Sequence, residues 1–243
     1  QDAHCFDGIA ANICGDLAVF KDHQGNMVRQ VRYENGTAVE TTRFIHDRLG
    51  RLIRIFDPLN VRWDYTYDVF GNRLTASDPG LGNWTMAYDD NGNLTTQTDA
   101  AGQQIIFTYD RINRVLLKRV GSGSTRVETH STYDQSRTGY LNRGMETRQD
   151  VWLGGPTGTL QHRVERDYQH HGNVAREVHT IDGRSYTLTN LYRQNGALLR
   201  QTLPARPGPN PPTLNVGDYQ YDAANRLVRV GDHITGITYD HWD

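Results

Sequence analysis

The sequence of 243 residues predicts an all-β fold in which consecutive antiparallel hairpins lie side by side in a single-layer sheet. Three observations lead to this prediction: an aspartate recurs every 21 residues, apolar and polar residues alternate before it, and a turn-forming residue follows it. Composition supports the single layer. The apolar share is low, roughly 41% when glycine is counted and tyrosine is not, against ~45–50% in ordinary domains. A single layer needs less apolar sequence than a solid two-layer core.

The repeat is most regular between residues 46 and 113. Four copies place an aspartate directly after a ring residue: His46-Asp47, Tyr67-Asp68, Tyr88-Asp89 and Tyr109-Asp110. A second aspartate keeps the same spacing at Asp57, Asp78 and Asp99. Three residues after the first aspartate stand Gly50, Gly71, Gly92 and Asn113, which are residue types that tolerate positive φ. This combination predicts that the chain reverses direction at each copy.

Looser copies extend the repeat toward both ends of the chain. They begin at Asp22, Tyr168, Tyr192 and Tyr221-Asp222, and a last fragment is Tyr239-Asp240. Tyr133-Asp134 opens a degenerate copy whose turn the sequence does not place. Eight or nine units then account for nearly the whole chain, so the repeat governs the interpretation of every motif in it.

Each unit is expected to be a hairpin. Before one aspartate, Trp63, Tyr65 and Tyr67 alternate with polar residues, which is the period of a strand with one buried face. The aspartate side chain is expected to accept a hydrogen bond from the backbone N–H two residues on. The returning strand opens five residues after the aspartate position, with Met27, Leu52, Leu94, Val115, Val174, Leu198 or Leu227.

One copy departs from this pattern, because Arg73 occupies the opening position and Leu74 follows one residue late. A slip of one residue would turn the side chains to the opposite face of the sheet. We therefore expect a β-bulge in that copy to restore the register.

The second aspartate is expected to end each returning strand at a corner, as in Asp57-Pro58 and Asp78-Pro79-Gly80, where proline fixes φ. Glycine-rich or proline-rich stretches near 121–160 and at 204–213 interrupt the repeat and are expected to be insertions in the sheet. The predicted organisation is thus an N-terminal segment, 1–18, followed by a repeat sheet, 19–243. Cys5 and Cys14 lie in the first segment, and the sequence leaves open whether they form a disulfide.

The units over 67–74 and 46–52 resemble the tyrosine-aspartate repeats of the Rhs family, also called YD-repeat proteins, which include bacterial polymorphic toxins, the encapsulating component of insecticidal toxin complexes, and teneurins. The resemblance covers roughly residues 19 to 243 and implies a spiralling single-layer sheet that forms part of a hollow shell. In bacterial members such a shell holds a toxic polypeptide. Family shells are several times longer than this chain, so other segments of a parent protein are expected to complete the wall. The resemblance also implies export, with a bacterial exported effector, secreted or at the cell surface, expected first.

Several catalytic or metal-binding alternatives have to be weighed against turns. The repeated aspartates occupy equivalent positions, whereas acid–base pairs need different environments. Asp89, Asn91 and Asn93 imitate the start of a calcium loop, but Gly92 stands between them. Asp78-Pro79-Gly80-Leu81-Gly82 resembles the self-cleavage motif of the family, yet its aspartate keeps the repeat spacing. We interpret all of these as turns.

Histidines and arginines have a similar interpretation. His170 and His171, with His162 and His179, raise the possibility of zinc, but the first two fill turn positions. Arg51, Arg114 and Arg226 are expected to pair with carboxylates on the wet face of the sheet. The sequence therefore predicts no catalytic, cofactor-binding or metal-binding residue.

The formal net charge of −2 gives no basic footprint for nucleic acid, and no apolar run reaches the length of a membrane span. The chain begins without methionine or a signal sequence and is expected to be cut from a longer precursor. Three functions remain. The first is a non-enzymatic shell segment that encloses a cargo polypeptide. The second is a surface adhesion module that binds a glycan or receptor through exposed aromatics such as Trp63, Trp84 or Trp152 and through the loop at 204–213. The third is an enzyme within 138–160, where Glu146 and Asp150 lie.

Overall fold

The computed structural model describes residues 5–8, 11–14, 17–203, 214–231, 234 and 236–240, with the side chains of 5–8, 11–14 and 214–217 left aside. In this part of the chain nearly all regular structure is β-strand, and the helical elements are two single 3₁₀ turns, η1 (Gly123–Thr125) and η2 (His170–Gly172). No helix in the described ranges is long and apolar enough to cross a membrane. The predicted all-β fold of consecutive antiparallel strands is confirmed.

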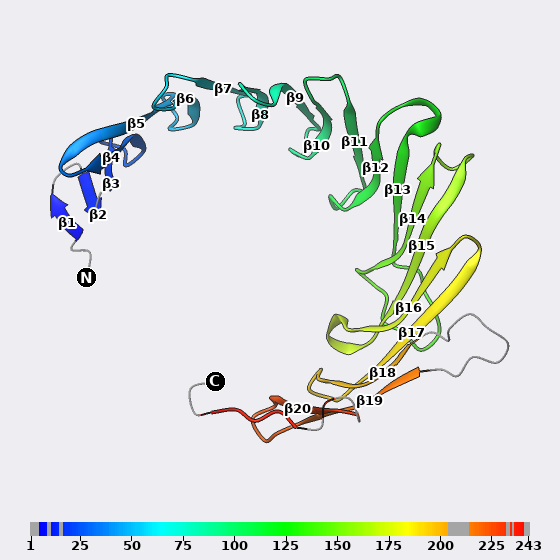
Figure 1. Cartoon of the computed structure of the whole chain (residues 1–243). Coiled ribbons are helices and arrows are strands. Elements are labelled where there is room, and N and C mark those ends of the chain that lie inside the picture. The colour runs from blue at the N-terminus through cyan, green and yellow to red at the C-terminus, as the bar shows by residue number, and fades with distance from the viewer. Residues whose placement is uncertain are drawn as a thin grey trace. The chain divides into compact units, whose positions relative to one another are not determined.

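The chain divides into two compact units, Gln1–Phe107 and Thr108–Asp243. In the first unit each strand pairs antiparallel with the next strand in sequence, so the unit is a single layer (Figure 1). Its strands are β1 (Cys5–Gly8), β2 (Ala11–Cys14), β3 (Leu17–Lys21), β4 (Met27–Glu34), β5 (Thr37–His46), β6 (Leu52–Phe56), β7 (Arg62–Tyr67), β8 (Arg73–Asp78), β9 (Gly82–Tyr88) and β10 (Leu94–Thr98), followed by β11 (Gln104–Tyr109), which crosses the boundary.

The second unit repeats the arrangement with longer strands. Each strand again pairs antiparallel with its sequence neighbour from β12 onward. The strands are β12 (Val115–Val120), β13 (Val127–Tyr133), β14 (Glu146–Leu153), β15 (Thr159–Tyr168), β16 (Val174–Ile181), β17 (Arg184–Tyr192), β18 (Leu198–Leu203), β19 (Leu214–Tyr221) and β20 (Leu227–Val230).

A β-bulge follows the turn in every copy whose register is described, not only in the one with Arg73. In that copy Thr66 pairs with Thr75 and Tyr67 pairs with Arg73, which leaves Leu74 as the extra residue. The equivalent extra residues elsewhere are Val28, Ile53, Thr95, Thr147, Ala175, Leu199 and Val228. The β-bulge expected in this copy is confirmed, but the view of Arg73 as an exception was wrong, because Arg73 takes the ordinary opening position and the bulge is common to the described copies.

The segments expected to interrupt the sheet have different outcomes. Much of 121–160 belongs to β13, β14 and the start of β15. Within this range the residues outside the strands are mainly η1, a loop at 134–145 and the connection at 154–158. The loop at 134–145 is the turn of the degenerate copy, enlarged, because Tyr133 pairs with Glu146 as Tyr67 pairs with Arg73. The proline-rich stretch at 204–213 lies outside the described residues. Cys5 and Cys14 are backbone partners across β1 and β2, and the possible disulfide concerns side chains outside the description.

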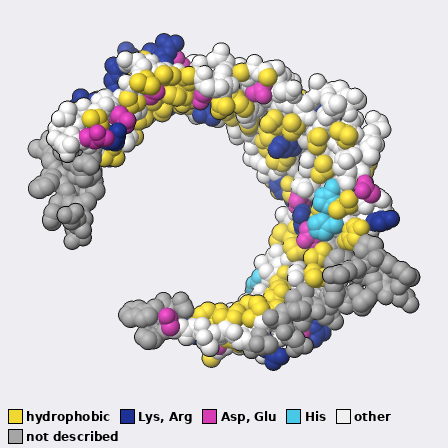
Figure 2. Space-filling view, in the orientation of Figure 1, with side chains coloured by type: hydrophobic (Ala, Val, Ile, Leu, Met, Phe, Trp, Pro, Cys, Tyr) yellow, Lys and Arg dark blue, Asp and Glu magenta, His cyan; other side chains and the backbone are white. Residues whose placement is uncertain are grey.

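Few side chains are fully buried, as a single layer requires. Among the described residues the buried apolar ones are Ala18, Val31, Val164, Tyr168, Ala175, Val178 and Val230. Trp84, Met86 and Tyr88 are half-buried and alternate with the exposed Thr85 and Ala87, as the period of two predicts. In Figure 2 the hydrophobic side chains of the first unit form a band along one side of its sheet. The aromatic face is thus left only partly covered.

Candidate functional site

The turns share one hydrogen-bond pattern, which Asp68 illustrates. Its carboxylate Oδ1 accepts bonds from the backbone N–H groups of Phe70, at 2.9 Å, and Asn72, at 2.8 Å. Its own N–H donates to the carbonyl of Asn72, at 2.9 Å, and Gly71 N–H donates to its carbonyl, at 3.3 Å. Gly71 has φ +94°, a conformation that side chains with a Cβ rarely adopt. The same pattern is built on Asp22, Asp47, Asp89, Asp110 and Asp222, with Gly25, Gly50, Gly92, Asn113 and Asn225 at positive φ.

The second carboxylate oxygen is held by the side chain four residues after the aspartate. Where that residue is asparagine, its Nδ2 donates, as in Asn72 to Asp68 at 2.9 Å. Where it is arginine, Nε donates: Arg51 to Asp47 at 2.7 Å, Arg114 to Asp110 at 2.7 Å and Arg226 to Asp222 at 2.9 Å. The backbone N–H of each of these arginines also lowers the pKa of its aspartate. These are the arginines expected to pair with carboxylates, and each binds the aspartate of its own turn, while Arg114 also binds Asp134 at 2.8 Å.

The corners at the opposite ends of the strands reuse the same turn. Asp57 Oδ1 accepts the N–H groups of Leu59 and Val61, each at 2.8 Å, and Asp99 does the same with Ala101, at 2.9 Å, and Gln103, at 2.8 Å. The corner at Asp78 is one residue tighter: its Oδ1 accepts from Gly80 and Leu81, and its Oδ2 accepts the indole N–H of Trp63 at 3.1 Å. The segment that resembles a cleavage motif is therefore a turn tied to the neighbouring strand.

In seven repeats the tyrosine directly before the turn links its repeat to the preceding one. Its hydroxyl donates to the carbonyl of the residue that opens the preceding returning strand: Tyr67 to Leu52 at 2.8 Å, Tyr88 to Arg73 at 3.0 Å, Tyr133 to Val115 at 3.0 Å, Tyr168 to Glu146 at 2.8 Å, Tyr192 to Val174 at 2.9 Å, Tyr221 to Leu198 at 2.9 Å and Tyr239 to Leu227 at 2.7 Å. We call these contacts the tyrosine links. Phenylalanine could fill the same apolar position but could not make the bond.

Several arginines stack on these tyrosines. The guanidinium carbon of Arg51 lies 5.1 Å from the ring centroid of Tyr67, and that of Arg114 lies 4.2 Å from Tyr133. Arg226 stands over Tyr239 at 4.5 Å. One arginine thus joins the carboxylate of its own turn to the aromatic ring of the next repeat, a cation–π contact that adds to the hydroxyl bond.

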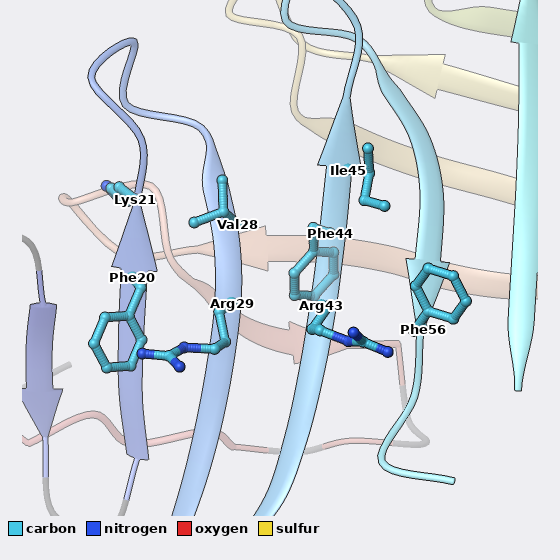
Figure 3. Close-up of a pocket in the computed structure, with 8 residues that line it drawn as sticks. All are labelled: Phe20, Lys21, Val28, Arg29, Arg43, Phe44, Ile45 and Phe56. Carbon is cyan, nitrogen blue, oxygen red and sulfur yellow. The ribbon is translucent and has the colours of Figure 1, made fainter. Parts of the chain in front are cut away.

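An open pocket of about 490 Å³ lies over β3 to β6 in the first unit (Figure 3). Its lining combines apolar side chains with cations: Phe20, Lys21, Val28, Arg29, Arg43, Phe44, Ile45 and Phe56. Arg29 stacks on Phe20, with its guanidinium carbon 3.9 Å from the ring centroid, and Arg43 stacks on Phe56 at 4.8 Å.

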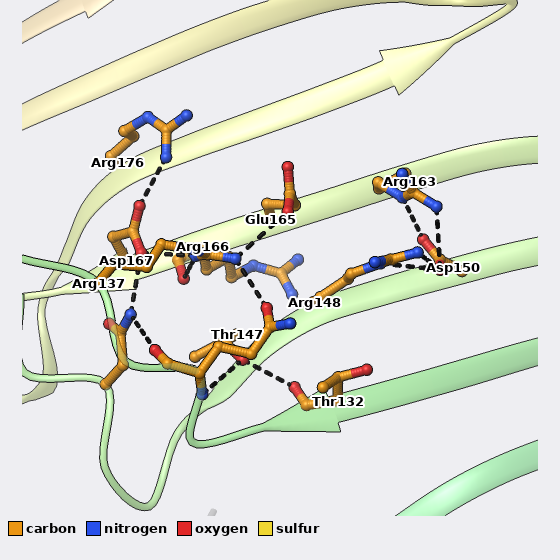
Figure 4. A network of polar contacts seen from close by, with 12 residues as sticks. Thr132, Arg137, Thr147, Arg148, Asp150, Arg163, Glu165, Arg166, Asp167 and Arg176 are labelled. Atoms are coloured by element: carbon orange, nitrogen blue, oxygen red, sulfur yellow. Dashed lines mark hydrogen bonds and ion pairs between the residues drawn. The ribbon is translucent and has the colours of Figure 1, made fainter.

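A buried ionic network anchors the enlarged loop of the second unit (Figure 4). The side chain of Asp167 is 0% exposed and binds Arg137 at 2.6 Å, Arg176 at 2.7 Å and the amide of Asn142 at 2.9 Å. Asn142 also accepts the N–H of Tyr168 at 2.9 Å. Burial alone would raise the pKa of Asp167, but the donors from Arg137, Asn142 and Arg176 outweigh it and lower the pKa. Arg137 of the loop therefore neutralises Asp167 of β15 and holds the loop against that strand.

Two further buried carboxylates are neutralised in the same way. Asp150 binds Arg148, at 2.5 Å, and Arg163, at 2.6 Å, on the neighbouring strand. Glu128, whose side chain is 2% exposed, binds Arg119 and Arg126, each at 2.8 Å, and His130 at 2.9 Å. Burial raises the pKa of Glu128, yet the bonds from Arg126, His130 and Arg119 bring it down to about 2. Such carboxylates stay ionised and hold strands together.

The other sequence candidates take up ordinary places in the sheet. Asp89 Oδ1 accepts the N–H groups of Asn91 and Asn93, so these three residues form a turn. His170 and His171 lie in η2, while His162 and His179 lie on β15 and β16, stacked with ring centroids 5.2 Å apart. Glu146 of the region 138–160 binds Arg166 at 3.2 Å. In the described part of the chain no group of three or more His, Cys, Asp or Glu side chains is arranged to hold a metal ion.

Comparison with known proteins finds a repeat model that matches part of the chain and solved structures with a similar fold. The family model described as RHS Repeat matches residues 46–80 and 88–127, and a comparison with curated proteins finds no match. The fold is similar to that in the crystal structure of TcdB2-TccC3, with a TM-score of 0.63, 15% identity, and coverage of 90% of this chain and 14% of that one. It is also similar to the Tc holotoxin pore of Photorhabdus luminescens with a TccC3 point mutation, with a TM-score of 0.55, 15% identity, and coverage of 88% and 12%.

The chain thus spans about a seventh of the length of those solved chains, and at this identity the likeness shows the fold. Residues 46–80 and 88–127 are thus Rhs, or YD, repeats, and the described sheet shares the fold of those solved chains.

Proposed function

We propose that this chain is a non-enzymatic segment of the wall of a shell, and that the complete shell encloses a toxin or other cargo polypeptide. The segment contributes by exclusion: a continuous sheet separates the cargo from solvent and from its target until release. Other segments of the parent protein complete the wall, and the parent is an exported, toxin-related protein.

The observation that carries this proposal is the series of tyrosine links. Each link joins the tyrosine beside the turn of one hairpin to the carbonyl at the bulge of the previous hairpin. The hydrogen bonds therefore connect successive repeats across the sheet. A single hairpin is marginal in water, and lateral pairing has to stabilise a long single-layer sheet. A wall needs this continuous lateral connection, whereas a small binding site would need it at only a few strands.

The uneven faces of the sheet support enclosure. Trp84 and Met86 lie on the aromatic face without a second layer of described residues over them, and both are only half-buried. A partly covered apolar face in a soluble protein marks a surface that meets another polypeptide or an enclosed space. The charged side chains of the second unit are paired across strands, as with Asp150 and Arg163, which stiffens the layer rather than preparing it for chemistry.

The adhesion hypothesis stays a prediction, which a glycan array with changes at the three tryptophans would test, since no contact among the described residues favours it. The indole N–H of Trp63 is bound to Asp78, and Trp84 and Trp152 are half-buried. The enzyme hypothesis is set aside in this proposal because the carboxylates of Glu146 and Asp150 are bound by arginines.

Native limited proteolysis of the complete parent protein tests the proposal. The cargo region should resist cleavage in the intact particle, and combined Tyr67→Phe, Tyr88→Phe and Tyr192→Phe changes should make it cleavable. A Tyr65→Phe variant, which changes a tyrosine outside the links, is the matched control. Equal cleavage of the cargo region in all three proteins, at the rate of the isolated cargo, would show that the sheet encloses nothing.

A further inference from the structure

Four strands of the first unit carry a transverse row of side chains that alternates rings and cations. The register pairs Phe20 with Arg29, Arg29 with Arg43, and Arg43 with Phe56. These four residues therefore share one face of the sheet, in a line across β3, β4, β5 and β6. We call this line the Phe–Arg row.

The centre of the Phe–Arg row places two positive charges opposite each other. Like charges on directly paired residues of neighbouring strands repel. Figure 3 shows that the two side chains extend away from each other, Arg29 toward Phe20 and Arg43 toward Phe56. The stacking on the two rings offsets part of the repulsion, and it leaves the guanidinium groups open on the pocket side.

The cations of this pocket differ from four other arginines of the same unit. Those four are neutralised: Arg32 by Glu34 and Glu40, Arg51 by Asp47, and Arg54 and Arg62 by Asp64. Arg43 instead donates to the neutral amide oxygen of Asn60 at 2.6 Å, and no carboxylate lines the pocket. Within the described residues neither Arg29 nor Arg43 has a carboxylate partner, and Lys21 adds a third charge.

We propose that the Phe–Arg row is a docking surface for an acidic, aromatic-containing segment of a partner polypeptide. Carboxylates of the segment would supply the negative charge that the pocket lacks, in bidentate bonds to Arg29 and Arg43. Apolar or aromatic side chains next to them would pack on Phe20 and Phe56.

The dimensions suit a peptide better than a small anion. Four neighbouring strands span about 14 Å at their usual spacing, which is the length of four or five residues of extended chain. A volume of about 490 Å³ also exceeds what one inorganic anion fills, and most of the lining residues are apolar. A peptide that crosses the row meets a ring, two guanidinium groups and a second ring in order. This inference is independent of the enclosure proposed above, since it needs only the local surface.

Binding of fluorescent polymers to the protein, followed by anisotropy, tests the assignment. A random copolymer of glutamate and tyrosine is expected to bind more tightly than polyglutamate, and polylysine is expected not to bind. The double variant Arg29→Gln/Arg43→Gln should weaken copolymer binding by about tenfold or more. The control is Arg48→Gln, which removes one arginine charge from an exposed turn outside the pocket and should leave binding unchanged.

Thermal unfolding of the double variant shows whether it still folds. Its Tm should stay at or above the wild-type value, since the variant removes a repelling pair of like charges. The variant Lys21→Gln changes an exposed side chain of the pocket and should weaken binding by about threefold.

Three results would overturn the proposal: binding unaffected by the double variant, equal loss in Arg48→Gln, or equal displacement of both acidic polymers by inorganic phosphate, which would indicate a simple anion site.

Discussion

The hydroxyl of Tyr67 donates a 2.8 Å hydrogen bond to the carbonyl oxygen of Leu52, fifteen residues earlier and in the preceding repeat. The backbone register between β6 and β7 ends at the pair Arg54–Asp64, two residues short of Leu52. The tyrosine hydroxyl thus bonds β7 to β6 beyond the point where their backbone hydrogen bonds stop. It also explains why repeats of this chain use tyrosine at a position that packing alone would allow phenylalanine to fill.

Tyr67→Phe is expected to destabilise the protein by about 0.5–1.5 kcal/mol, because the carbonyl of Leu52 loses its donor while packing is kept. Tyr65→Phe is the control, since Tyr65 lies on the same strand and face but its hydroxyl makes no hydrogen bond to the described residues. Urea unfolding at constant m-value gives both free energies. Equal losses in the two variants would mean that the tyrosine link does not stabilise the sheet.

Asp89→Ala is expected to lower Tm by a few degrees, since its carboxylate accepts bonds from the N–H groups of Asn91 and Asn93 and from the side chain of Asn93. Asp90→Ala removes the same charge from the adjacent, exposed position, which makes no such bonds. Differential scanning calorimetry should therefore separate the variants. A Tm for Asp89→Ala no lower than that for Asp90→Ala would contradict a turn-stabilising role.

Much of the fold could be predicted because its signal is local and periodic. The sequence signal of the turn is an aspartate, a positive-φ residue three positions on and a donor at the fourth, and all three are visible around Asp68. Gln169 and Arg193 replace the aspartate in two copies, yet the backbone turn persists, with their N–H groups bonded to Asn173 and Ala197. The backbone pattern tolerates substitutions that hide the sequence signal.

The features that the sequence did not predict depend on distant contacts. The enlarged loop at 134–145 breaks the spacing, and its anchor joins Asn142 to Asp167, 25 residues away. The tyrosine links join different repeats, so no single repeat reveals them. The recurrence of tyrosine rather than phenylalanine before the turn is the sequence signal that could have revealed the hydroxyl bond.

Glu128 makes stability depend on pH in the acid range. Its folded-state pKa of about 2 lies below the ordinary value of 4.5, so its contribution to stability is complete above about pH 4.5. As pH falls from there toward 2, protonation favours the unfolded chain and that contribution is lost. Urea unfolding at a series of pH values should show a smaller acid-induced loss in Glu128→Gln than in the wild type, although the variant is less stable at pH 7 because Arg119 and Arg126 lose their counter-charge. Parallel curves for the two proteins would show that other carboxylates set the acid limit.

His46 occupies the tyrosine position of its repeat but makes no tyrosine-type link, and its buried Nδ1 has no hydrogen-bond partner in the described chain. The backbone around His46 matches that around Tyr67. The register between β4 and β5 ends at the pair Arg29–Arg43, and Arg29 lies two residues after Met27, as Arg54 lies two residues after Leu52. His46→Tyr should therefore place a hydroxyl at the carbonyl of Met27 and raise stability by about 1 kcal/mol, or roughly 2–4 °C in Tm. His46→Phe is the matched control, since it supplies the ring without the donor. A gain confined to tyrosine would show that the link can be transferred between repeats, and equal Tm values for the two variants would show that the ring alone decides.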